Sequence, residues 1–223
     1  MVTAPIIVDA PVAQSWFIRT VPPRTEEAVY ELPSDVADMA AVRGSVFVLD
    51  WGWLRDNVMF DRYADALGES RSLLDATSGE WIEMDRALEH YRALDSLGFT
   101  TNEAAEVGRT VGPRVHGAVL RTLVRLAGTL GVGPWAAVRQ APKLWDRSFR
   151  GGAIAAFKTG ERSGRLALRQ TRLAGSKFFR ASIGGVTLAG LEPFCKRAIV
   201  QEIREARTPT SFDLRISWND GAA

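Results

Sequence analysis

The chain of 223 residues carries few side chains of the kinds that catalyse reactions or bind metals. It has two histidines, His90 and His116, and one cysteine, Cys195. No HExxH, HxH or paired His and Cys spacing occurs, so the pattern of a zinc site is absent and no metal is expected. A single cysteine also excludes a disulfide within the chain and fits a reducing, cytoplasmic setting.

Sequence patterns typical of catalysis are missing as well. The chain contains no G-x-S-x-G elbow, no Walker A motif and no Rossmann glycine pattern. Its carboxylates are frequent between residues 50 and 106, at spacings typical of solvated helix faces. None stands in an isolated apolar setting, as a tuned acid or base would. We therefore expect a protein that is not an enzyme and that uses no cofactor.

The formal net charge of +2 hides a strong asymmetry along the chain. Residues 1–108 carry 8 Lys and Arg against 19 Asp and Glu, whereas residues 109–180 carry 15 against 2. A basic segment can mark an anionic partner, but the acidic segment of the same chain would repel nucleic acid. We expect the two segments to complement each other, and we expect no nucleic-acid partner.

The run "QAPKLWDRSFRGG" combines cations and aromatic residues ahead of a double glycine. Lys143, Arg147 and Arg150 recur at spacings of four and three residues and therefore share one helix face. Trp145 and Phe149 lie off that face, so we expect the cations to face solvent and the aromatic rings to face the interior. The glycines mark the end of the helix, where the period of the pattern changes from 3.6 to 2.

Helical spacing of apolar residues dominates 53–149, with helices predicted over 53–67 and 79–98. The run "SVFVL" before them is either a short strand or the cap of the next helix. Thr100 and Glu103 have the spacing of a capping box. Breaks or kinks are predicted at Gly112-Pro113 and at Pro142, since proline removes a helix hydrogen bond.

Strand patterns follow the double glycine. Two strands are predicted around a turn at 159–164, then a helix over 176–194 and two more strands, the last ending at Trp218. Helices followed by strands predict an α+β fold: an N-terminal helical layer packed on a C-terminal antiparallel sheet of about four strands, with one intervening helix. Residues 1–42 are rich in proline and are predicted to be an irregular N-terminal extension, with "SWFIRTV" as a candidate edge strand; 43–223 are predicted to form a single domain.

The order of these elements resembles a known family. "VRGSVF", a helix, "GEW", a helix ending in "LDSLG", "EVGRTVG", "APKLWDRSFRGG", a hairpin, a glycine-rich helix and a last strand follow one another over about 43–218. This order resembles the DUF2378-type family of myxobacteria. More distantly it is similar to vinyl-reductase-type domains, to TRAPP trafficking subunits and to haem-NO-binding domains, which share the NO-signalling and Golgi-transport fold.

The resemblance implies a helical layer against an antiparallel sheet, with an apolar cavity that in relatives holds a small aromatic molecule, an acyl chain or haem. Several relatives dimerise. Haem-binding relatives use a helical histidine and a Tyr-x-Ser-x-Arg motif, which this sequence lacks. Acylated relatives use a cysteine near the cavity, which Cys195 does not match in position. The zinc cysteines of the vinyl-reductase-type domains are also missing.

Three functions stay open from the sequence. The first is a non-enzymatic sensory domain that binds a small apolar or amphipathic ligand between helices and sheet. The second is an interaction module whose acidic and basic faces form a homodimer or a docking face for a partner, and the third is a haem-based gas sensor. No run of about 20 apolar residues predicts an integral membrane segment, and the N-terminus lacks the basic start of a signal peptide. The candidate ligand-binding residues, each of which could instead belong to a solid core, are Trp81, Tyr91, His116, Arg121, Trp135, Trp145, Phe149 and Phe179.

Overall fold

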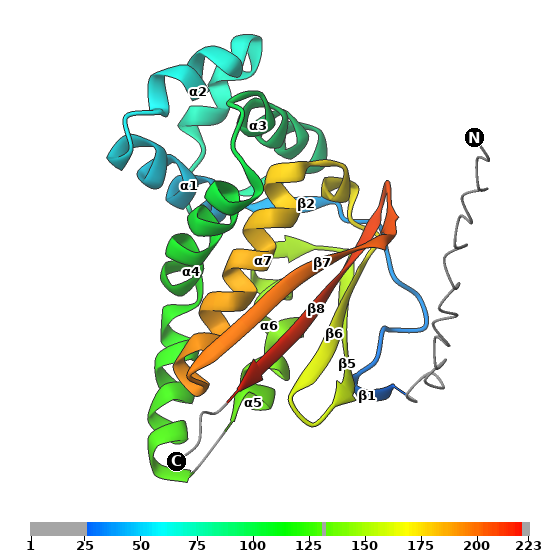
Figure 1. Cartoon of the computed structure of the whole chain (residues 1–223). Helices are drawn as coiled ribbons and strands as arrows, with labels where there is room; N and C mark the ends of the chain where they lie inside the picture. The colour runs from blue at the N-terminus through cyan, green and yellow to red at the C-terminus, as the bar shows by residue number, and fades with distance from the viewer. Residues whose placement is uncertain (1–25, 131–132, 220–223) are drawn as a thin grey trace, which may run out of the picture.

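Helices fill most of the chain before residue 149 and strands most of it afterwards (Figure 1). The computed structural model describes residues 26–130 and 133–219, apart from the side chains of residues 115–121 and 123–130. The mixture of helices with antiparallel sheets is that of an α+β fold, as the sequence predicts. In chain order the elements are β1 (Glu27–Tyr30), β2 (Ala41–Arg43), α1 (Gly44–Asp56), α2 (Phe60–Ala66), η1 (Gly68–Asp75), β3 (Trp81–Glu83), α3 (Met84–Ser96), α4 (Thr101–Leu130), α5 (Pro134–Val138), α6 (Ala141–Ser148), β4 (Phe149–Arg150), β5 (Ala153–Gly160), β6 (Ser163–Arg169), η2 (Arg172–Gly175), α7 (Lys177–Leu191), η3 (Glu192–Phe194), β7 (Arg197–Thr208) and β8 (Ser211–Asn219).

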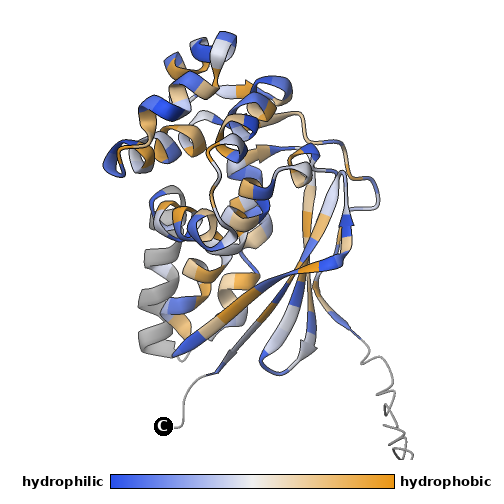
Figure 2. Cartoon of the chain, turned by 45° about the horizontal axis from the view of Figure 1, so that its top comes forward, coloured by the Kyte–Doolittle hydropathy of each residue, from blue (hydrophilic) through white to orange (hydrophobic). Residues whose placement is uncertain are grey.

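The larger sheet has five strands in the order β1-β5-β6-β8-β7, and every neighbouring pair is antiparallel. Hydrophobic and hydrophilic residues alternate along its long strands (Figure 2). In β8, the last predicted strand, alternate residues share one face of the sheet. On that face Phe212, Leu214, Ile216 and Trp218 are buried. That face meets α7, which lies across the sheet with α4 alongside it (Figure 1).

A second sheet of three strands has the order β3-β2-β4. It joins the helices to the larger sheet, since β4 runs into β5 through Gly151 and Gly152, whose φ angles are 73° and 62°. Both values suit glycine. A Cβ on Gly151 would also lie 2.1 Å from the carbonyl oxygen of Asp38. The double glycine is therefore the point at which the two sheets meet.

The segment predicted to be irregular contains two strands, β1 and β2. Their lengths of 4 and 3 residues give too short a run for alternation to be visible in the sequence, and pairing with β5 and β3 defines them. The sheet accordingly has five strands where about four were predicted, because β1 extends its edge. The candidate strand "SWFIRTV" lies outside the described residues.

Three predicted local structures differ in the helical part. The helix predicted over 79–98 begins only at Met84, because Trp81–Glu83 form strand β3, which pairs with β2. The run "SVFVL" is helical, because Phe47, Trp51 and Leu54 recur at helical spacing and are all buried in the core. The helix predicted over 53–67 is two helices, interrupted at Val58, whose φ is 58°.

Proline acts differently at its two predicted sites. Pro113 lies inside the continuous α4, since packing along α7 holds this helix together despite the missing hydrogen bond. Pro142 stands in the first turn of α6, where its missing N–H costs little, so the break predicted there is confirmed.

The capping box at the start of α4 forms as predicted. The backbone N–H of Thr100 donates to Glu103 Oε2 at 2.8 Å, and the backbone N–H of Glu103 donates to Thr100 Oγ1 at 3.2 Å. The two reciprocal bonds satisfy helix-end donors that would otherwise lack partners. They fix where α4 begins, and with it the position of the residues that follow along α7.

Two close contacts set the distance between α4 and α7. A Cβ on Gly108 would lie 1.9 Å from the carbonyl oxygen of Ser182, and one on Gly185 would lie 1.8 Å from that of Ala105. No side chain fits there without moving the backbone, so glycine lets the two helices approach closely at this end. Further along, toward the far end of α7, the two helices border a pocket.

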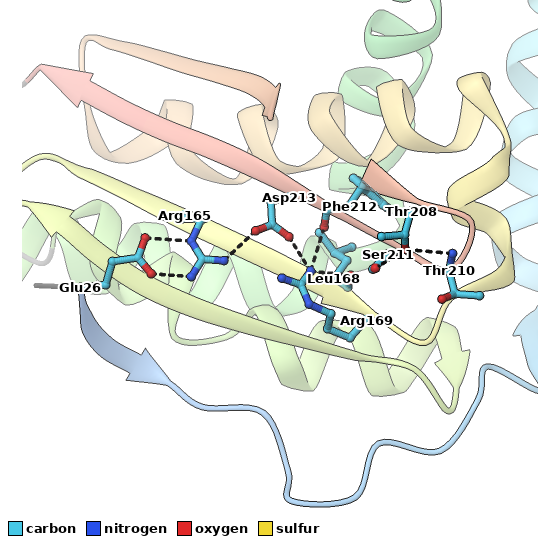
Figure 3. A network of polar contacts seen from close by, with 9 residues as sticks. All are labelled: Glu26, Arg165, Leu168, Arg169, Thr208, Thr210, Ser211, Phe212 and Asp213. Atoms are coloured by element: carbon cyan, nitrogen blue, oxygen red, sulfur yellow. Dashed lines mark hydrogen bonds and ion pairs between the residues drawn. The ribbon is translucent and has the colours of Figure 1, made fainter. Parts of the chain in front are cut away.

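Ion pairs join the acidic and basic segments of the chain. Arg165 Nε donates to Glu26 Oε1 at 2.9 Å, and Arg165 Nη1 donates to Asp213 Oδ2 at 2.6 Å (Figure 3). Arg169 pairs with the other oxygen of the same Asp213 carboxylate, which is 2% exposed. The charge asymmetry of the sequence is thus partly neutralised within the chain. Among the described helices, none is long and apolar enough to span a membrane.

Candidate functional site

An apolar pocket of about 100 Å³ lies between α4, α5, α6 and α7 on one side and the inner face of β5 and β6 on the other. Of the α7 residues that border it, Ile183, Val186 and Thr187 are half-buried, whereas Leu191 and the β6 residue Leu166 are buried. The pocket therefore reaches from the core toward the surface beside α7. The described residues that line it are Gly112, Ala137, Val138, Ala141, Leu144, Trp145, Ser148, Phe149, Ile154, Leu166, Ile183, Val186, Thr187, Gly190 and Leu191.

Helix α6 places the aromatic wall of this pocket. Trp145 and Phe149 are buried, with ring centroids 4.3 Å apart. The indole Nε1 of Trp145 donates to the carbonyl oxygen of Gly151 at 3.2 Å, which ties the ring to the double glycine. The outward face of the same segment carries Lys143 and Arg147, which are exposed. The sequence prediction of an inward aromatic side and an outward cationic side is confirmed for these residues. Arg150, predicted on the same helix face, is exposed but lies in strand β4, because α6 ends at Ser148.

Small residues make the space. Ala137 and Ala141 face the pocket from α5 and α6, and Gly112 and Gly190 from α4 and α7. A Cβ on Gly190 would meet nothing within 4 Å, so this position leaves room that a larger side chain would fill. Protein interiors are otherwise packed with few voids. The pocket therefore exists because residues at the helix positions around it are small.

Polar groups in the pocket are few. Thr187 contributes a hydroxyl, which donates to the carbonyl oxygen of Ile183 at 2.8 Å within its own helix. Ser148 contributes the other hydroxyl and is 4% exposed. No described lining residue carries a charge. An environment of this kind suits an uncharged, mostly apolar molecule, since burying a charge without a partner is very costly.

The structure brings two of the eight candidate residues, Trp145 and Phe149, into this pocket. Phe179 lies directly behind them, with its ring 6.0 Å from Phe149 and nearly perpendicular to it. It is fully buried and belongs to the core. His116 and Arg121 belong to α4, but their side chains lie outside the described part of the chain.

The other three candidates lie elsewhere. Tyr91 is buried among aromatic rings of the helical part, including Phe178. Trp135 packs edge-on against Trp218 and donates its indole N–H to the carbonyl oxygen of Glu161 at 3.0 Å. Trp81 lies in the small sheet, between guanidinium groups considered below. None of these rings lines the pocket, because helical and strand phase direct them to other parts of the core.

The residues that the sequence analysis missed are mostly small or aliphatic. Ala137, Ala141 and Gly190 carry no chemical signature, and an aliphatic residue such as Ile183 reads as ordinary core. The available signal was the cluster of small residues on α7 ("GGVTLAG"), which marks a helix with little side-chain volume on several faces. That signal does not reveal which of the glycines are in contact with α4 and which border a space.

A chain of buried polar groups connects α1, α2 and α3 away from the pocket. Trp51 Nε1 donates to the hydroxyl oxygen of Tyr63 at 3.0 Å, and that hydroxyl lies 2.7 Å from His90 Nδ1. A neutral His90 that donates from Nε2 to the Asp50 carboxylate accepts at Nδ1, so the Tyr63 hydroxyl donates to Nδ1. His90 Nε2 then carries a proton that it donates to Asp50 Oδ2 at 3.2 Å. Burial raises the pKa of Asp50, and the hydrogen bond from His90 opposes that rise.

Both ring nitrogens of His90 are therefore engaged, and the side chain is 0% exposed. Phe47 covers the ring with its centroid 4.2 Å away. In this arrangement His90 is a hydrogen-bonded core residue, with no nitrogen directed to a pocket. No group of three His, Cys, Asp or Glu side chains suited to a metal ion occurs in the described residues.

On the small sheet, Trp81 is flanked by two cations. The guanidinium carbon of Arg43 lies 4.9 Å from the Trp81 ring centroid, and that of Arg150 lies 4.4 Å from it. Cations at these distances are attracted to the face of an indole ring. The contact explains how Trp81 and Arg150 pack at the surface, where Arg150 is exposed. It lies apart from the described lining of the pocket.

No family model matches the chain, and no curated protein sequence matches it. Solved structures of H-NOX domains do match. The Fe(II) unliganded H-NOX protein from K. algicida is 13% identical with a TM-score of 0.54, over 81% of this chain and 98% of that one. An oxygen-binding H-NOX domain related to soluble guanylate cyclases is 14% identical with a TM-score of 0.54, over 79% and 94%. A mutant of T. tengcongensis H-NOX is 14% identical with a TM-score of 0.53, over 81% and 100%.

At this level of identity the likeness shows a shared fold. The matched H-NOX structures agree with the predicted resemblance at the level of the fold. Neither the family models nor the curated sequences support the DUF2378-type resemblance. The chain spans nearly the whole length of these H-NOX structures.

Proposed function

We propose that this chain is a non-enzymatic sensory domain that binds a small, mostly apolar molecule in the pocket between α6, α7 and the sheet. The observation that carries the proposal is the pocket itself: about 100 Å³ lined by apolar side chains, with Trp145 and Phe149 as its aromatic wall. An engineered apolar cavity of about 150 Å³ in another protein stays dry and binds benzene or xenon. The pocket here is of the same order of size, so benzene serves as its probe.

The test uses benzene as probe and two neighbouring alanines of α5. Ala137 lines the pocket, whereas Ala136 next to it does not. Ala137→Leu places an isopropyl group in the space, so we expect benzene binding by the full chain, followed by NMR titration, to be lost or weakened at least tenfold. Ala136→Leu is the matched control and should bind as the wild type does. Equal binding by the two variants, or no binding by the wild type, would overturn the proposal.

A haem-based gas sensor is the second candidate, and the fold comparison favours it: the matched solved structures are H-NOX domains, and one of them concerns haem distortion in that family. The described residues fit haem poorly. No described lining residue is a His, Tyr, Cys or Met that could ligate iron, and none is an Arg or Lys that could meet a propionate. His90 has both ring nitrogens engaged.

Haem binding would then depend on His116, which follows the lining residue Gly112 by four positions in α4. The two candidates separate in one absorption experiment. The full chain is incubated with haemin, desalted and scanned for a Soret band, and the same is done with His116→Ala. A stable Soret band that the variant loses would establish the haem sensor. If the wild type retains no haem, the haem sensor is ruled out.

The homodimer expected from the charge asymmetry stays a prediction. Exposed cations on α6 and at Arg150 provide a basic surface, and the acidic helices α1 to α3 gather at one end of the molecule (Figure 1). Attraction between such surfaces weakens with salt. Sedimentation of the full chain at low and high salt would show association that decreases as salt rises, and no association at either concentration would count against a dimer.

A further inference from the structure

Ser148 is the exception among the buried Ser and Thr hydroxyl groups of the described chain. Four Ser and Thr residues are buried in the described part of the chain: Ser148, Thr171, Ser176 and Ser182. Ser176 Oγ accepts from the backbone N–H of Phe179, and Ser182 donates to the Phe179 carbonyl oxygen.

Thr171 Oγ1 donates to Met39 Sδ at 3.4 Å. Ser148 Oγ has no hydrogen-bond partner among the described residues. It stands at the end of α6, where the backbone turns into β4, and Ser148 lines the apolar pocket. A buried hydroxyl without a partner is thus found at the site where a ligand is expected.

An unpaired buried hydroxyl costs free energy, and native structures rarely leave one without a reason. At Ser148 the surroundings are apolar, and Trp145 and Thr187 direct their own polar hydrogens to backbone carbonyl oxygens. The Ser148 hydroxyl is therefore the polar side-chain group of the described lining that still lacks a hydrogen-bond partner. That partner is either a molecule in the pocket or a water.

We propose that the ligand is an uncharged molecule of about six non-hydrogen atoms, with an apolar body and one hydroxyl or carbonyl oxygen bonded to Ser148. This inference rests on the proposed function and gives its ligand a chemical class. Trp145, Leu166 and Ile183 would contact the apolar body of the ligand. The ligand is uncharged because no described lining residue carries a charge. The single oxygen of the ligand would bond to Ser148 Oγ, the one hydroxyl of the described pocket lining that has no hydrogen-bond partner.

The experiment compares two probes of the same shape, cyclopentane and cyclopentanol, which differ by one hydroxyl. Their dissociation constants are measured by NMR titration of the full chain for the wild type, Ser148→Ala and Thr187→Val. Ser148→Ala removes the unpaired hydroxyl. Thr187→Val removes a hydroxyl of the same pocket that is already bonded within the helix, and it keeps the shape of the side chain. Thermal melts of each variant check that it folds.

We expect Ser148→Ala to weaken cyclopentanol relative to cyclopentane by about three- to tenfold, the effect of one hydrogen bond. Thr187→Val should leave this ratio of dissociation constants unchanged. If both probes bind but Ser148→Ala leaves their ratio unchanged, the hydroxyl serves a bound water and the inference is overturned while the proposed function stands. If neither probe binds the wild type, the proposed function itself is overturned.

Discussion

Trp145, in the last turn of α6, and Phe149, the first residue of β4, have ring centroids 4.3 Å from each other and planes inclined by 36°. Together they form one wall of the apolar pocket, and Phe179 backs that wall edge-on. The pair stands where α6 ends and the chain passes into the sheets. Trp145 and Phe149 are thus buried in the interior, whereas the cations Lys143 and Arg147 of α6 are exposed.

Replacing Trp145 should enlarge the pocket in a way that a ligand can reverse. Trp145→Ala removes a buried indole, and we expect it to lower the free energy of unfolding by about 3–5 kcal/mol. Indole should bind in the vacated space and raise the melting temperature of the variant. Trp53→Ala is the control, since Trp53 is half-buried away from the pocket. A melting temperature of Trp145→Ala that does not respond to indole would contradict the prediction.

Two glycines of α7 should respond to alanine with opposite signs. Gly185→Ala places a Cβ 1.8 Å from the carbonyl oxygen of Ala105, so α4 and α7 must separate and we expect a loss of about 1–3 kcal/mol. Gly190→Ala places its Cβ in open space and should gain about 0.5–1 kcal/mol by favouring the helix. Urea unfolding measures both changes. Two changes of the same sign would show that the helix packing is not as described.

The buried Asp50 should make stability depend on pH. Its pKa is raised above 3.8 by burial, so the folded chain binds this proton more readily than the unfolded chain does. The stability that the proton contributes is present below pH 3.8 and is lost as the pH rises through the raised pKa of the folded state.

Asp50→Asn removes the titrating carboxyl group, and His90 is present in both the wild type and this variant. The free energy of unfolding of the wild type, minus that of Asp50→Asn, should therefore fall as the pH rises from about 4 to about 7.5. Urea unfolding at several pH values gives this difference directly. A difference that stays constant across the range would mean that Asp50 is not the buried group that the structure shows.

Asp213 should contribute strongly to stability for a side chain on the outer face of the sheet. It accepts from Arg165 at 2.6 Å and from Arg169, and both bonds join ionised groups (Figure 3). We expect Asp213→Ala to lower the free energy of unfolding by about 1.5–3 kcal/mol. Asp146→Ala, at an exposed carboxylate of α6, should change it by less than about 0.5 kcal/mol. Similar effects of the two variants would refute the role of this network.

The periodic parts of the sequence predicted the fold well, and particular residues show why. The alternation of Phe212, Leu214, Ile216 and Trp218 defines β8, since one face of the sheet is buried. The capping residues Thr100 and Glu103 identify the start of α4. Local signals of this kind are strong where a single physical cause, such as burial of one face, acts on each residue.

Features that depend on distant partners could not be predicted. Strand β1 is defined by its pairing with β5, and α4 passes through Pro113 because α7 supports it. The pocket depends on small residues from four helices, and nothing in the sequence places Ala137 opposite Gly190. Aromatic candidates such as Tyr91 and Trp135 instead pack in other parts of the core, because residue type alone does not distinguish a lining ring from a core ring.

The central claim is that the space beside Trp145 accepts a small apolar guest. A crystal of the full chain pressurised with xenon tests it directly, because xenon enters dry apolar cavities and is seen by its electron density. The account predicts a xenon atom bounded by Trp145, Leu166 and Ile183, and none there in Ala137→Leu. A pressurised wild-type crystal with xenon elsewhere but not between these side chains would contradict it.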